Sequence, residues 1–113
     1  MNGRYEKTVR IASELILYCK YIGGTTCQVT TDIQQDYETC EISSPIAHFE
    51  HEELEKLKND LNQPRDRAME TIYMLLCGQP EHEPQIRLIG AMVDEAKISY
   101  ENGILHIWII HRP

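Results

Sequence analysis

Two histidines and several carboxylates lie close together near the middle of the chain. His48 and His51 are three residues apart, and they would share a helix face with Glu52 or Glu55. Imidazole and carboxylate groups in this arrangement can bind a divalent metal. The segment has no His-Glu-x-x-His pattern, and no third ligand is identifiable. We therefore expect no metal or other cofactor, and we keep a small metal-dependent enzyme that uses His48 and His51 as an alternative.

Glu14 and Tyr18 are four residues apart and could form a general acid–base pair. The simpler interpretation is that Glu14 is an exposed helix residue. The other histidines are scattered, and we expect His82, His106 and His111 at the surface. The chain has no Gly-x-Ser-x-Gly, P-loop or dinucleotide fingerprint. No catalytic signature is therefore evident, and the chain is more readily interpreted as a protein without enzymatic activity.

Four cysteines could form two disulfides or a zinc site: Cys19, Cys27, Cys40 and Cys77. No pair has the Cys-x-x-Cys spacing, and each falls within an apolar pattern, with Cys27 and Cys40 on predicted inward strand faces. A nucleophilic thiol would need a histidine or a helix N-terminus to lower its pKa. We expect reduced thiols that pack as small hydrophobic groups.

The charge balance restricts the partners of this protein. The chain has 18 acidic residues against 11 basic ones, a net charge of −7. This argues against binding to nucleic acid or to an anionic membrane, for which a basic surface supplies the affinity. No apolar run approaches the roughly 20 residues of a membrane span, and the N-terminal segment has no signal-peptide core. We expect a cytoplasmic protein, and its 113 residues predict a single domain, 1–113.

The elements that would position these residues follow from hydrophobic periodicity. It predicts helices that cover residues 5–22, 49–61, 64–77 and 85–95. The apolar stripe of the first helix consists of Val9, Ala12, Ile16 and Cys19, widened by Ile11, Leu15, Tyr18 and Ile22. Pro64 suits the first turn of the third helix, which is expected to end at Cys77-Gly78 before a polar loop at 79–84. The last helix is expected to bury Ile86, Ile89, Met92 and Val93.

Alternation of apolar and polar residues predicts two β-hairpins. The first joins residues 25–34 and 37–44 through a turn at 34–36. Its inward side is expected to carry Cys27, Val29, Thr31, Ile33, Cys40 and Ile42. The second hairpin covers residues 96–110, because Asn102-Gly103 tolerates the positive φ of a type I′ turn. This turn places Tyr100 opposite Leu105, Ile98 opposite Ile107 and Ala96 opposite Ile109.

The other face of the closing hairpin is also partly apolar. It carries Ile104, Trp108 and Ile110 beside charged and polar residues. Tryptophan is enriched at association hot spots, so we predict that these three residues form an interface and that the protein is a homodimer. The alternatives are that they are the core face of the sheet, or that a terminal tail or a crystal neighbour covers them.

Together the elements predict a two-layer α/β sandwich. The two hairpins would form a four-stranded, mostly antiparallel sheet, with three to four helices on one face. The order of elements resembles the ATP-binding fold of the GHKL family (gyrase, heat-shock chaperone, histidine kinase and MutL), and especially the small anti-sigma-factor kinases. In that family a helix carries a Glu and, four residues later, an Asn that holds magnesium. Residues 13–18 lie where this motif would be, and Glu14 matches. Residues 40–45 and 86–110 resemble the adenine-binding strand and the last helix and hairpin.

The departures from the family bear on function. Tyr18 occupies the position of the magnesium-binding Asn, and a phenol is a poor ligand for a hard cation. Ser44 or its neighbour replaces the Asp that binds adenine. Glycine-rich loops bind phosphates through backbone N–H groups, and carboxylates and prolines at those places oppose this. The corresponding segment here contains Pro80, Glu81, Glu83, Pro84 and Gln85.

The resemblance and its departures together imply a regulatory protein-binding module without enzymatic activity. Glu14, Tyr18 and Ser44 would mark a vestigial nucleotide pocket, and the protein partner is not identifiable from the sequence. The main alternative is an active, ATP-binding serine kinase of the anti-sigma-factor type. That alternative would require the nucleotide motifs to lie at other positions of the chain.

Overall fold

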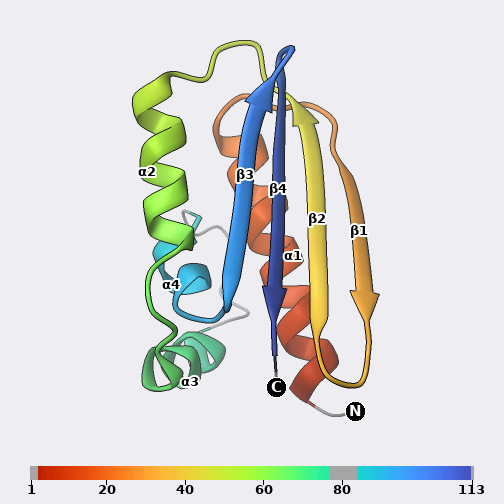
Figure 1. The fold of residues 1–113 in the computed structure, drawn as a ribbon, viewed down its shortest axis with the longest axis vertical. Coiled ribbons are helices and arrows are strands. Elements are labelled where there is room, and N and C mark those ends of the chain that lie inside the picture. Colours follow the sequence, from red (N-terminus) through yellow and green to blue (C-terminus); the bar gives the residue numbers. More distant parts are fainter. Residues whose placement is uncertain (1–2, 77–83, 113) are drawn as a thin grey trace.

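The two predicted hairpins form one four-stranded antiparallel sheet in the order β1-β2-β4-β3 (Figure 1). The computed structural model describes residues 3–76 and 84–112. Its elements are α1 (Gly3–Tyr21), β1 (Gln28–Ile33), β2 (Glu38–Pro45), α2 (His51–Leu61), α3 (Arg67–Leu76), α4 (Ile86–Gly90), β3 (Glu95–Glu101) and β4 (Ile104–His111). Helices α1 and α2 pack on the same side of the sheet, α1 on β2 and α2 on β3. The predicted two-layer α/β sandwich is confirmed.

Both predicted turns are present. Asn102 and Gly103 have φ angles of 53° and 76°, the left-handed conformation that a type I′ turn requires. The register that follows places Tyr100 opposite Leu105, as predicted. The first hairpin turns at residues 34–36, where the chain reverses between β1 and β2. Short-range turn chemistry therefore specified both hairpins.

The core lies between the inner face of the sheet and the helices. Helices, strands and the segments between them all contribute fully buried side chains: Ile11, Leu15, Ile42, Ile46, Leu57, Leu61, Ile89, Met92, Leu105, Ile107 and Ile109. Cys40 and Ile42 point inward from β2, as predicted. The predicted core residues of the last helix segment, from Ile86 to Val93, are also buried.

Strand β1 is not covered in the way that its sequence pattern predicted. All six of its residues are exposed, and Cys27 just before it is exposed as well. The prediction that Val29, Thr31 and Ile33 point into the core is therefore wrong. The reason is tertiary: α1 packs against β2, and no helix in the described ranges packs closely on β1.

The core-facing side of α1 also differs from the predicted stripe. Ile11, Leu15 and Cys19 are buried, whereas Val9 is 63% and Ile16 is 41% exposed. Both sets of residues recur at helical spacing, so periodicity alone could not decide which set faces the sheet.

Two helix boundaries differ from prediction. Helix α3 begins at Arg67 rather than at Pro64, because the Asp66 side chain accepts hydrogen bonds from the backbone N–H groups of Ala68 and Met69 and so caps the helix. The last helix ends at Gly90 instead of residue 95. The backbone N–H of Asp94 donates to the carbonyl of Ile110, so the chain has already joined the sheet by then. The predicted helix end at Cys77-Gly78 and nearly all of the loop at 79–84 lie outside the described residues.

Candidate functional site

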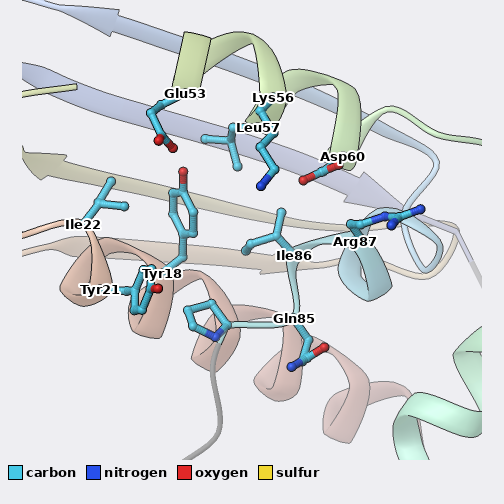
Figure 2. Close-up of a pocket in the computed structure, with 11 residues that line it drawn as sticks. Tyr18, Tyr21, Ile22, Glu53, Lys56, Leu57, Asp60, Gln85, Ile86 and Arg87 are labelled. Carbon is cyan, nitrogen blue, oxygen red and sulfur yellow. The ribbon is translucent and has the colours of Figure 1, made fainter. Parts of the chain in front are cut away.

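A hollow of about 340 Å³ lies between α1, α2 and the start of α4 (Figure 2). Helix α1 contributes Tyr18 and Tyr21, and α2 contributes Glu53, Lys56 and Asp60. The start of α4 contributes residues 84–87. The phenol of Tyr18 points across the hollow toward α2 in Figure 2. Two acidic and two basic side chains thus line this site together with two phenols.

Tyr18 is the one residue of the predicted nucleotide pocket that lines this hollow. Burial raises the pKa of its phenol well above the usual range, and the negative charge of Glu53 raises it further. The phenol therefore stays protonated at neutral pH. It can donate a hydrogen bond, but it lacks the negative charge that a magnesium ion prefers in an oxygen ligand.

Glu14 is buried rather than exposed, which corrects the simpler interpretation of its sequence position. Glu14 is only 4% exposed, and its Oε2 accepts a hydrogen bond of 3.0 Å from the backbone N–H of Gln85. The carboxylate therefore holds the segment before α4 against α1. Glu14 is adjacent to the hollow through Gln85, but it is not part of its lining.

Ser44 lies elsewhere. It is fully buried on the inner face of β2, and its hydroxyl donates to the carbonyl of Thr26 at 2.7 Å. This bond fixes the loop between α1 and β1. The structure therefore places Glu14 and Tyr18 at or beside the hollow and leaves Ser44 outside it. Of the residues expected at the phosphate-loop position, Glu81 and Glu83 lie outside the described ranges.

The predicted metal ligands His48 and His51 are both exposed. Within residues 3–76 and 84–112, no group of three His, Cys, Asp or Glu side chains is placed to hold a metal ion. In this part of the chain the two histidines therefore have no third protein ligand beside them.

The cysteines differ in their surroundings. Cys19 and Cys40 are buried, and burial raises the pKa of each thiol to about 11. Neither thiol therefore forms much thiolate at neutral pH. Cys27 is a free thiol that is exposed, not inward as predicted. Cys77 lies outside the described residues.

A buried polar cluster lies between α1 and the sheet, where β2 begins and β4 ends. It consists of Thr8, Glu38 and His111. His111 is 2% exposed, which corrects its predicted surface position. Its Nε2 lies 3.3 Å from both Thr8 Oγ1 and Glu38 Oε2. A catalytic triad needs a different ring nitrogen for each partner, and these two contacts share Nε2, so they do not have the geometry of a triad. The pairing of Glu38 with His111 across β2 and β4 is non-local, and no sequence signal indicated it.

Next to this cluster is a network of charged residues that the sequence also did not reveal. Glu70 on α3 contacts both Lys7 on α1 and Arg65, with Arg65 Nη2 at 3.2 Å. Arg65 Nη1 also lies 3.2 Å from Asp94 Oδ2. Burial, together with the positive charges of Arg65 and Arg67, lowers the pKa of Lys7 to about 8. The network ties α1, α3 and the start of β3 together.

The predicted interface residues lie on the sheet face that the helices leave open. Ile104 is 45% exposed, Trp108 is partly buried, and Ile110 is only 9% exposed. Lys97 Nζ lies 5.2 Å from the centroid of the Trp108 ring, a cation–π arrangement that shields part of the ring. The exposed apolar surface here therefore comes from Ile104 and Trp108.

Among the described residues, no helix combines the length and apolar character that crossing a membrane requires. No protein-family model matches this chain, and no curated protein matches it.

Proposed function

We propose that this protein is a regulatory module that binds another protein and has no enzymatic activity of its own. In this proposal its fold derives from the GHKL nucleotide-binding fold, and its nucleotide contacts have been lost. The hollow between α1, α2 and α4 would then be the remnant of the nucleotide site.

The hydrogen bond from Gln85 to Glu14 is the observation that carries this proposal. In the family that the sequence resembles, the Glu that Glu14 matches belongs to the helix motif of the nucleotide site. Here Glu14 is buried and accepts a hydrogen bond from a backbone N–H of its own chain, which supports a structural role for this carboxylate. Freeing the carboxylate would leave a partly buried backbone N–H without this acceptor, which costs stability.

The charges of the hollow support the same conclusion. Lys56 and Arg87 are balanced there by Glu53 and Asp60, so the hollow offers no net positive charge to a triphosphate. The Tyr18 phenol stays protonated. Pro84 at the edge of the hollow has no backbone N–H to offer a phosphate. These features together disfavour ATP and its magnesium ion.

The proposed contact surface for the protein partner is the open sheet face around Trp108 and Ile104. Sheet faces that carry an aromatic side chain among charged residues have the composition of protein interfaces. Lys97, Glu41 and His106 surround the tryptophan on the neighbouring strand positions, and they would form the polar rim.

Isothermal titration calorimetry with ATP and magnesium tests the loss of nucleotide binding. We expect no saturable heat up to ligand concentrations of about 1 mM, which corresponds to a binding free energy weaker than about −4 kcal/mol. Saturable binding below that concentration would contradict the proposal. In that case the Glu14→Ala variant decides between the alternatives: an active kinase would lose binding while circular dichroism shows an unchanged fold.

A further inference from the structure

Strand β1 is an exposed sheet edge with few of the features that usually protect an edge. Figure 1 shows it as the outermost strand, on the side of the sheet away from α2. Its sequence, residues 28–33, contains no Lys, Arg or Pro and a single charged residue, Asp32, and its pairing with β2 runs without a bulge over all six residues. Monomeric proteins usually protect edges with these devices. The opposite edge strand, β3, carries Glu95, Lys97 and Glu101 and is packed against α2.

An exposed apolar flank of α1 runs beside this edge. At about 100° per residue, Val9, Ala12 and Ile16 lie on one flank of the helix, and Glu14 and Tyr18 lie on the other. Glu14 and Tyr18 face α4 and α2, which lie toward β3. Because α1 packs beneath β2, its other flank is directed to the β1 side. Val9 and Ile16 are 63% and 41% exposed there.

The exposed apolar residues of α1 and β1 lie at the same levels along the direction of β1. Thr8 contacts His111 on β4. His111 pairs with Glu38 on β2, and Glu38 pairs with Ile33 on β1. Val9 is therefore near the Ile33 end of β1. The helix runs antiparallel to the strand (Figure 1), so Ile16 lies toward the Val29 end.

The two apolar pairs also have similar lengths. Val9 and Ile16 are seven residues apart, or about 10 Å along a helix. Val29 and Ile33 are four residues apart, or about 13 Å along a strand. The small residue Ala12 and the neutral residue Thr31 occupy the two midpoints. One two-fold axis can therefore relate both pairs to those of a second copy.

We propose that two copies of this chain associate through β1 and α1, about a two-fold axis that passes beside Thr31 and Ala12. The two β1 strands pair antiparallel and form a continuous eight-stranded sheet. On the helix side, the exposed Val9 of each copy is directed toward Ile16 of the other and adds apolar surface beside the strand pair. This inference does not depend on whether the hollow binds a nucleotide.

The sequence of β1 matches this register and not the neighbouring ones. With the axis at Thr31, Val29 of each copy lies opposite Ile33 of the other on the helix side. On the open side, each Thr30 lies opposite an Asp32, whose carboxylate can accept from the threonine hydroxyl. An axis at Asp32 would bring two carboxylates together, and an axis at Thr30 would place Val29 opposite Thr31. Like charges directly opposite each other destabilise a strand pair.

Charge substitutions at the axis test the proposal, because Thr31 of one copy faces Thr31 of the other. Thr31 is exposed in one chain, so Thr31→Lys and Thr31→Glu should both fold. Sedimentation of the unmodified protein at 0.15 M salt should give twice the 13.1 kDa mass of one chain. Each variant alone should sediment at the single-chain mass, because it opposes two like charges. An equimolar mixture of the two variants should regain the double mass.

Trp108→Glu on the open face is the matched control, with circular dichroism confirming the fold of each variant. It should leave the double mass unchanged and so separate the β1 edge from the face predicted from sequence. Ile16→Glu, on exposed helix surface, should also give the single-chain mass. The proposal is overturned if the unmodified protein is monomeric at all concentrations. It is equally overturned if the Thr31 variants stay dimeric, or if Trp108→Glu alone separates the copies.

Discussion

Single residues in this protein take their chemistry from their surroundings more than from their type. The buried thiols of Cys19 and Cys40 have pKa values raised to about 11, whereas Cys27 is exposed. Glu14 and His111 look like surface groups in the sequence, but they are 4% and 2% exposed. Each is held by a partner far away in the sequence: Gln85 for Glu14, and Thr8 for His111.

Thiol alkylation should distinguish the cysteines. At pH 8 iodoacetamide should modify Cys27 at least about tenfold faster than Cys19 or Cys40, because thiolate is the reactive form and both buried thiols ionise only near pH 11. Peptide mass spectrometry at a series of times gives the rates. A Cys27→Ser variant should lose the fast phase from that peptide, and in urea Cys19 and Cys40 should react as fast as free cysteine. Equal rates in the folded protein would contradict the burial described for these thiols.

At the scale of elements, α4 and the C-terminal end of α2 approach each other through their backbones. A Cβ atom on Gly90 would lie 1.8 Å from the carbonyl oxygen of Asp60. The side-chain amide of Gln63 donates to the same carbonyl at 2.9 Å. Position 90 therefore has room only for glycine. Helix α4 ends at this residue, where its backbone contacts α2.

Gly90→Ala should destabilise the protein by about 2–3 kcal/mol, because the new methyl group must push two backbone segments apart. Urea denaturation followed by circular dichroism measures the change. Ser13→Ala, at an exposed position in α1, is the control and should change the stability by less than about 0.5 kcal/mol. A neutral effect of Gly90→Ala would mean that α4 does not contact α2 as closely as described.

At the scale of the whole molecule, a charged network ties together parts of the chain that the sheet does not join. Lys7 of α1 and Arg65 share the carboxylate of Glu70 on α3, and Arg65 also contacts Asp94 before β3. Two cations share one carboxylate here, and the Lys7 side chain is only 17% exposed. Burial of Lys7, together with the positive charges of Arg65 and Arg67, outweighs the attraction of the carboxylates of Glu38 and Asp94, and the pKa of Lys7 falls from 10.5 to about 8.

This shift predicts a pH dependence of stability. Between pH 8 and 10.5 the unfolded chain binds the Lys7 proton more readily than the folded one, so the contribution of Lys7 to stability rises with pH. Below pH 8 Lys7 is charged in both states, and the cost of its burial is present in full. Urea unfolding of the unmodified protein and of Lys7→Met should be compared at pH 7 and pH 10. The stability of the variant relative to the unmodified protein should fall by about 1 kcal/mol, after allowance for solvent screening. A constant difference would contradict the shift.

The sequence by itself determined both hairpins, the helices and the two-layer architecture. Turn chemistry and hydrophobic periodicity are local, so Asn102-Gly103 and the alternation of β2 specify their structures without knowledge of the rest of the chain. Tyr18, which lines the hollow, was singled out by the family resemblance and not by these local signals.

Only the tertiary structure decided which apolar surfaces are covered and which polar groups are buried. Val9, Ile16, Val29 and Ile33 have the pattern of core residues, but they are exposed because α1 packs beneath β2 and leaves β1 uncovered. The burial of Glu14 and His111 depends on non-local contacts. Hydrophobic periodicity in the sequence indicates which residues share one face of a helix or strand. The packing of elements that are distant in the sequence determines whether that face is buried or exposed.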